Sequence, residues 1–270
     1  MAEIARSFHD LNYIDTLSCM DSPVHRIDPR AKLATFLIFA VCVVSFGKYE
    51  VSALLPYFFF PAVIIPLARI PARYFAGKIV FLLPFAVLIG IFNPLYDRET
   101  LLSIAGLPVS GGMISFVSIL IRFILTILAA LMLVAVTGFT GVCMALERFG
   151  VPKTFTTQLM MLYRYIFVLT SEGMRMARAR DLRAVGRKGS GLKVYGSLIG
   201  YLLIRTWNRA QRIHMAMLSR GYRGDFFLRR PLRITSADIA FGLGWSAVFI
   251  TLRFINLPRI AGQLIMGVLS

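Results

Sequence analysis

Residues 171–222 read SEGMRMARARDLRAVGRKGSGLKVYGSLIGYLLIRTWNRAQRIHMAMLSRGY and form a basic stretch between apolar segments. An arginine at the centre of a bilayer costs at least about 2.5 kcal/mol, so this stretch is not expected to lie in lipid. Residues 171–235 hold 15 of the 30 Lys and Arg but 3 of the 13 acids, a net charge of +12. Positive clusters between apolar spans are typical of cytoplasmic loops in membrane proteins. The stretch is therefore predicted to lie on an aqueous, cytoplasmic face.

The second half of this stretch has the pattern of a long amphipathic helix. At about 100° per residue, a cationic set and an apolar set fall on opposite sides. The two sets are Arg205, Arg209, Arg212 and Arg220, and Ile199, Leu203, Trp207, Ala210, Met217 and Leu218. Gly221 is predicted to end the helix, because glycine tolerates the left-handed conformation that closes a last turn. Arg220 would then lie at the helix tip, at the negative end of the helix dipole.

The first half is predicted to be a second, less regular amphipathic helix. Arg180, Arg183 and Arg187 share one face, whereas Arg178 falls on the apolar side. The small residues that follow are expected to break the helix; they are Gly186, Gly189, Ser190 and Gly191. The pattern therefore predicts two basic helices that meet at a flexible corner, each with an arginine near one end.

The composition favours a membrane protein, because 57% of the 270 residues are hydrophobic. The formal charge of +17 would suit a nucleic-acid partner, but its concentration between apolar spans argues against one. The three cysteines, Cys19, Cys42 and Cys143, have no disulfide or zinc spacing. Residues 1–20 lack an apolar core, so no cleavable signal peptide is expected.

Five apolar stretches are predicted to cross the membrane, with the N-terminus inside and the C-terminus outside. They are residues 31–46, 51–67, 79–92, 113–136 and 239–252. The second contains three prolines and is expected to be kinked and packed against neighbours. Residues 155–170 would span only about 24 Å as a helix. This is less than the roughly 30 Å hydrocarbon core, so they are interpreted as an interfacial or partly embedded helix that leads into the basic stretch.

Several single residues support specific expectations within this plan. Asp28 is placed to cap a helix that begins at Pro29. Arg122, inside the fourth predicted span, is expected to snorkel or to pair with an acid of the preceding loop. His214 falls on the apolar side of its helix, where packing is the simplest role. Four regions follow: an N-terminal segment 1–30, a transmembrane region 31–137, a coupling-helix region 138–235 and a last span with its tail, 236–270.

Two arginine signatures, residues 177–183 (ARARDLR) and 216–222 (AMLSRGY), combine with residues 25–33 (HRIDPRAKL) before the first span. Together they resemble the transmembrane T component of energy-coupling factor (ECF) transporters. Residues 195–200 (YGSLIG) and 209–213 (RAQRI) are most similar to the cobalt/nickel, CbiQ-like branch.

The signatures depart from the usual Ala-Arg-Gly form, but both keep the arginine. The first reads Ala179-Arg180-Asp181 and the second Ser219-Arg220-Gly221. The resemblance implies that Arg180 and Arg220 couple to ATPase subunits, with Arg178 and Arg183 as alternatives for the first position.

The resemblance implies an all-α membrane protein with about five transmembrane helices and long amphipathic cytoplasmic coupling helices, located in a bacterial inner membrane. Its expected partners are ATP-binding cassette ATPases, a multi-span metal-binding S component (CbiM-like) and a small accessory membrane subunit. The cargo would be cobalt, as used in cobalamin biosynthesis, or nickel. Apolar residues of the basic stretch would pack against the S component; they include Met174, Leu182 and Met217.

The residues contain no P-loop, dinucleotide fingerprint, HExxH or nucleophile elbow. The chain is therefore expected to be a non-catalytic subunit without a cofactor or bound metal of its own. One alternative is a T component that serves a vitamin-binding subunit. Another is a membrane enzyme acting on lipid phosphates, which would need clustered acids; Asp181, Asp225 and Asp238 are isolated in the sequence. A nucleic-acid-binding membrane anchor is less favoured than either.

Overall fold

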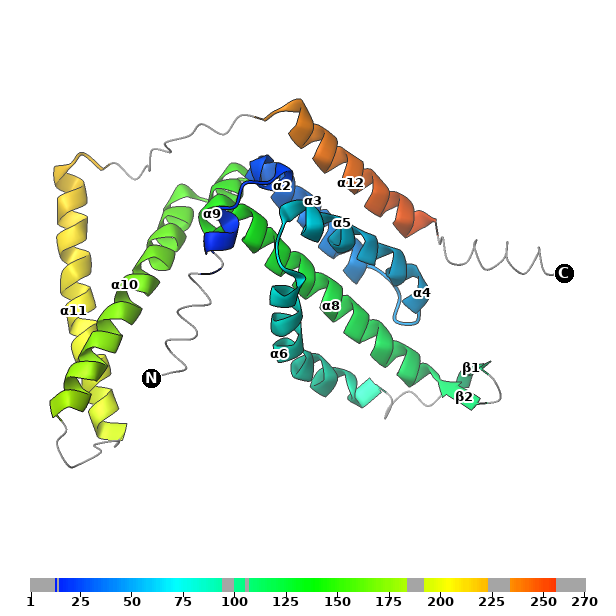
Figure 1. Ribbon diagram of the computed structural model, residues 1–270, viewed down its shortest axis with the longest axis horizontal. Helices are drawn as coiled ribbons and strands as arrows, with labels where there is room; N and C mark the ends of the chain where they lie inside the picture. Colours follow the sequence, from blue (N-terminus) through cyan, green and yellow to red (C-terminus); the bar gives the residue numbers. More distant parts are fainter. Residues whose placement is uncertain are drawn as a thin grey trace. The chain divides into compact units, whose positions relative to one another are not determined.

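The computed structural model describes residues 13, 15–93, 100–104, 107–183, 192–222 and 234–255 (Figure 1). Contacts between Cα atoms divide the chain into two compact units. One unit contains α9 (Phe139–Arg148), α10 (Lys153–Arg183) and α11 (Leu192–Ser219). The other contains α2 (Pro23–Arg26), α3 (Pro29–Val44), α4 (Val51–Leu54), η1 (Leu55–Phe58), α5 (Phe59–Ala68), α6 (Ala72–Gly90), β1 (Thr100–Ile104), β2 (Leu107–Ser110), α8 (Gly111–Thr137) and α12 (Ser236–Phe254).

Four helical segments among the described residues are long and apolar enough to cross a membrane. They are Val51–Ala68, Ala72–Gly90, Gly111–Thr137 and Ser236–Phe254. The predicted class, an all-α membrane protein, is confirmed. The first predicted span corresponds to α3, whose 16 residues extend about 24 Å. It is shorter than the other four, and its crossing stays a prediction.

The connection between α6 and α8 contains a short β-hairpin that the sequence did not predict. Strands β1 and β2 are antiparallel, with Thr100 opposite Ser110 and Ile104 opposite Leu107. The register shifts between Thr100 and Leu102. Two strands of five and four residues are too short to produce a clear alternating pattern, which is why this segment reads as a loop.

The predicted kink of the second span is confirmed. Its helix is interrupted by the 3₁₀ turn η1, which contains Pro56. Proline has no N–H to donate to the preceding turn, so the regular hydrogen-bond ladder breaks there. The N–H of Phe59 is shared between the carbonyls of Pro56 and Tyr57, and α5 then continues the span.

Aromatic side chains form the core that joins α3, the kinked span and α12. Phe249 of α12 is 1% exposed, and its ring centroid lies 5.1 Å from that of Phe39 and 5.0 Å from that of Phe60. The buried Tyr57 hydroxyl donates to the Phe249 carbonyl oxygen at 2.8 Å. The last helix is therefore held against the first two spans by ring packing and one buried hydrogen bond.

Two arginines donate hydrogen bonds to the turn that follows α3. Arg253 donates from Nε to the Ser45 hydroxyl at 2.8 Å and from Nη2 to the Ser45 carbonyl at 3.0 Å. Arg122 donates to the Gly47 carbonyl. Arg122 thus has a backbone partner in this turn, whereas the acids of the loop before α8, Asp97 and Glu99, lie outside the described residues.

Gly90 marks a close approach of α6 to α8. A Cβ at this position would lie 2.7 and 2.9 Å from two ring carbons of Phe116. We expect Gly90→Ala to lower the free energy of unfolding by about 1 to 3 kcal/mol, because the ring and helix must shift. Unfolding of the purified protein in mixed detergent micelles measures the change.

Gly77 provides the matched control on the same helix. Apart from the backbone of its own helix, no atom of the described residues lies within 4 Å of a Cβ added there. Alanine has the higher helix propensity, so Gly77→Ala is expected to be neutral or to stabilise the protein by up to about 1 kcal/mol. Equal destabilisation by both variants would show that packing against Phe116 is not the cause.

Candidate functional site

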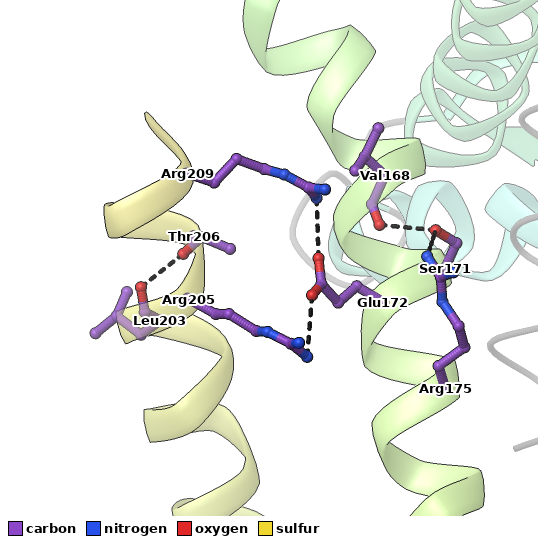
Figure 2. A network of polar contacts seen from close by, with 8 residues as sticks. All are labelled: Val168, Ser171, Glu172, Arg175, Leu203, Arg205, Thr206 and Arg209. Carbon is purple, nitrogen blue, oxygen red and sulfur yellow. Dashed lines mark hydrogen bonds and ion pairs between the residues drawn. The ribbon is translucent and has the colours of Figure 1, made fainter. Parts of the chain in front are cut away.

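Helix α10 contains both the apolar residues 155–170 and the start of the basic stretch, up to residue 183. It is a single helix of 31 residues, so the helix expected over residues 155–170 continues without a break into the basic stretch, and its interfacial or partly embedded position stays a prediction. Thr170 and Ser171, where the apolar and basic parts of α10 meet, donate hydrogen bonds from their hydroxyls to carbonyls of the same helix. Ser171 donates to the Val168 carbonyl at 2.8 Å (Figure 2). Thr170 donates to the Ile166 carbonyl, also at 2.8 Å. Such bonds to the preceding turn allow Ser and Thr to lie inside a helix.

Helix α11 ends as the sequence predicted. Gly221 has a φ of 77°, in the left-handed region that glycine adopts without a steric penalty. Its N–H donates to the Leu218 carbonyl at 2.9 Å, and the Tyr222 N–H donates to the Met217 carbonyl at 3.0 Å. These two bonds define a Schellman motif. Arg220 is therefore the last residue before the reversal, and its side chain is exposed at the helix tip.

Helices α10 and α11 run antiparallel within their unit (Figure 1). The end of α10 meets the start of α11, where the Arg180 guanidinium lies 4.8 Å from the centroid of the Tyr195 ring. At the other end of the pair, Thr154 and Tyr222 line one groove. About 25 residues of helix separate Tyr195 from Arg220, roughly 37 Å along the axis. The two signature arginines therefore lie towards opposite ends of the pair.

Arg180 is held in place at its end of the pair. Its Nε and Nη2 donate to Asp181 Oδ1 at 3.1 and 2.7 Å. The hydrogen bonds that Arg180 donates to Asp181, and then its interaction with Tyr195, raise the pKa of Arg180. Its Nη1 makes no hydrogen bond among the described residues. Arg178 and Arg183, the other candidates for this position, are exposed.

The residues beside the signature arginines are solvent-accessible. Ala179, Asp181 and Ser219 are exposed, and the Ser219 hydroxyl donates to the Met215 carbonyl at 2.9 Å. The predicted corner residues between the two helices, 186–191, lie outside the described part of the chain.

An ion-pair cluster at the middle of the helix pair was missed in the sequence. The Glu172 carboxylate of α10 binds two arginines of α11, with Oε1 3.2 Å from Arg205 Nη1 and Oε2 2.9 Å from Arg209 Nη1 (Figure 2). The available signal was one of only two acids in a basic helix, together with two arginines four residues apart on one face of the next helix. Part of the predicted cationic face therefore packs against α10 and is not simply solvated.

A groove of about 790 Å³ opens between the first half of α10 and the second half of α11. Its lining is mainly apolar, and several of these side chains are exposed; they include Phe155, Leu162, Leu203 and Trp207. Met217 and His214 also line it, so the predicted apolar side of α11 faces this groove. Of the other residues expected to pack on a partner, Leu182 is exposed and Met174 is half-buried.

A second polar cluster is built by residues 25–33, before and at the start of α3. Asp28 caps α3 as predicted, accepting from the Arg30 N–H at 2.9 Å. The buried Lys32 ammonium donates to the carbonyls of His25 and Val136 at 3.0 and 3.2 Å. Burial, and then the Lys32 charge, lower the pKa of His25. The N-terminal motif is thus a structural cluster that ties the start of α3 to the end of α8.

No group of three His, Cys, Asp or Glu side chains among the described residues could hold a metal ion. Cys42 and Cys143 are buried and Cys19 is exposed, and none of the three forms a disulfide with another described cysteine.

The fold and site together define a helical membrane protein that has apolar helices long enough to cross a membrane and a pair of long basic helices, α10 and α11. A family model described as cobalt transport protein CbiQ matches residues 20–230. The chain belongs to this CbiQ family, in agreement with the resemblance seen in its signatures, and is a transmembrane component of an ECF/CbiQ-type transporter.

Three relatives illustrate the range of the family. An uncharacterized protein of Methanocaldococcus jannaschii is 28% identical, over 81% of this chain and 77% of the relative. The energy-coupling factor transporter transmembrane protein EcfT of Limosilactobacillus fermentum is 29% identical, over 76% of this chain and 82% of the relative. The cobalt transport protein CbiQ of Salmonella typhimurium is 26% identical, over 54% and 70%.

Proposed function

We propose that this protein is the energy-coupling T component of an ECF importer for cobalt or nickel. It would link ATP-binding cassette ATPases to a separate metal-binding membrane subunit. The observation that carries this proposal is the antiparallel pair α10 and α11, which has Arg180 beside Tyr195 at one end and Arg220 towards the other. Two well-separated arginines suit two ATPase subunits better than one.

Arginine is the suitable residue for such contacts because its planar guanidinium binds carboxylates or carbonyls through two parallel hydrogen bonds, which lysine cannot copy. Arg220 already projects from a rigid helix tip that the Schellman motif closes. The Nη1 of Arg180 makes no hydrogen bond among the described residues, and its Nε and Nη2 both donate to Asp181. An ATPase acceptor would therefore either join the Arg180–Asp181 pair or replace Asp181 in it.

The proposed mechanism is mechanical. The sequence contains no P-loop, so ATP would be hydrolysed by the partner subunits. Their closure would move α10 relative to α11, and the apolar groove between these helices would pass the motion to the substrate-binding subunit. Flexible side chains such as Met217 suit a surface that must re-pack during this motion. The net positive charge of the basic stretch favours a cytoplasmic position for both helices.

The cobalt assignment rests on the names of the family model and of the Salmonella relative. The name of the EcfT relative specifies no substrate. A T component that serves a vitamin-binding subunit is therefore the alternative. The metal or vitamin content of the purified complex distinguishes the two.

The test of coupling is a pull-down of the tagged chain with the candidate ATPase subunits in detergent. We expect Arg180→Glu and Arg220→Glu each to weaken ATPase binding at least about tenfold, because each buries a carboxylate where the partner offers acceptors. Arg178→Glu and Arg183→Glu test the alternative positions on α10.

Arg212→Glu is the matched control, since Arg212 is an exposed arginine on the same helix as Arg220. Size-exclusion profiles show whether each variant stays folded. Unchanged ATPase binding and ATP-driven uptake in the folded Arg180 and Arg220 variants would overturn the proposal.

A further inference from the structure

Helices α10 and α11 contact each other near their middle as well as at the Arg180–Tyr195 end. The Glu172 side chain is 15% exposed, and its two oxygens each bind one arginine of α11. The next residue, Gly173, lies beside Leu202, whose Cδ2 would be 3.7 Å from an added Cβ. Towards Arg220 the helices diverge around the apolar groove. The ion pairs therefore lie where the two helices approach each other, next to the apolar groove on the Arg220 side.

The charges of the two helices make this contact specific. Helix α11 contains no Asp or Glu in its 28 residues, and α10 contains only Glu172 and Asp181. Asp181 binds Arg180 of its own helix. The charge–charge attraction between α11 and the similarly basic α10 among the described residues thus comes from Glu172, whose carboxylate binds two arginines one helical turn apart.

Glu172 lies between the two signature arginines along the pair. Arg180 is eight residues further along α10, about 12 Å, and Arg220 is eleven residues beyond Arg209 along α11, roughly 16 Å. A rotation of α10 against α11 about this contact would change the position of one signature arginine relative to the other. Because one carboxylate bridges two guanidiniums, either ion pair can persist while the other lengthens.

We infer that Glu172 is a positioning residue that acts as the pivot of the coupling pair, with Arg205 and Arg209 as its partners. It sets the crossing of α10 and α11 and so transmits movement of one signature arginine to the other. This inference rests on the proposed coupling function, but its geometric part concerns this chain alone.

The first experiment measures the crossing in the purified full-length chain. Spin labels replace Leu162 on α10 and Met215 on α11, which are both exposed, in a Cys19→Ser background. We expect Glu172→Gln to broaden or lengthen the distance distribution, because the neutral amide cannot hold two guanidiniums. Glu172→Asp keeps the charge and should restore much of the parent distribution. Arg212→Gln, which removes a cation outside the cluster, should leave the distribution unchanged.

The second experiment uses the reconstituted transporter and measures metal ions imported per ATP hydrolysed. We expect Glu172→Gln to lower this ratio at least about fivefold, with ATPase binding retained. If Glu172 were only a structural contact, Glu172→Gln would leave the import ratio unchanged, and Glu172→Asp would have no loss to restore.

The outcomes separate this inference from the proposed function. An unchanged distance distribution in Glu172→Gln overturns the pivot, whatever the ATPase data show. An altered distribution with an unchanged import ratio overturns its role in coupling. If Arg180→Glu and Arg220→Glu leave ATPase binding intact, the proposed function fails, while the distance measurement still reports on the pivot.

Discussion

Replacing Asp238 by alanine is expected to lower the free energy of unfolding by about 3 to 5 kcal/mol. The Asp238 side chain is buried and accepts from the Asp28 N–H at 2.8 Å and the Thr235 N–H at 2.6 Å. Its charge also attracts the buried Lys32 ammonium. Alanine would leave two N–H donors without an acceptor and a buried cation with less compensation.

The effect can be followed by Trp245 fluorescence during unfolding in mixed micelles, because this ring packs in the aromatic core of α12. Asp21→Ala is the matched control, since Asp21 forms an exposed ion pair with Arg26 at 2.7 Å. Solvent screens such pairs, so we expect a far smaller change. Similar losses in both variants would mean that the buried position of Asp238 is not what matters.

Phe249→Ala is expected to destabilise the protein by about 3 to 5 kcal/mol as well. The Phe249 ring contacts Phe39, Phe60 and Trp245, so its removal leaves a cavity between three segments. Packing is a main source of helix association in lipid, where apolar burial contributes little. The loss should therefore appear as weaker association of α12 with α3, measured by the same unfolding titration.

Phe254→Ala removes the same atoms from the end of the same helix. Phe254 is 84% exposed, so its removal creates no cavity, and we expect a change within about 0.5 kcal/mol. If both phenylalanine variants lost the same stability, ring packing in the core would not explain the result for Phe249.

Local backbone structure was predictable wherever a residue determines the conformation of its own helical turn. Asp28 caps the helix after it because its side chain reaches the Arg30 N–H, and Gly221 ends α11 because it adopts a positive φ. Pro56 interrupts its span for an equally local reason, the missing N–H. Apolar length similarly predicted the four segments that can cross a membrane.

Errors arose where short-range signals were weak or ambiguous. The change from an apolar to a basic composition after residue 170 led to two segments being treated apart, yet the hydroxyls of Thr170 and Ser171 bond to the preceding turn and α10 continues. The two strands of the hairpin are too short for their period to be recognised. In both cases the backbone hydrogen bonds that decide the structure leave little trace in composition.

The sequence by itself determined the membrane class, the two arginine signatures and the ends of several helices, because these depend on composition and on contacts within one turn. Only the tertiary structure decided which distant charges meet. Glu172 finds Arg205 and Arg209 because α10 and α11 fold back on each other, and Asp238 meets Asp28 from 210 residues away. Helical periodicity places a charge on a face, but the partner across that face depends on how whole helices pack.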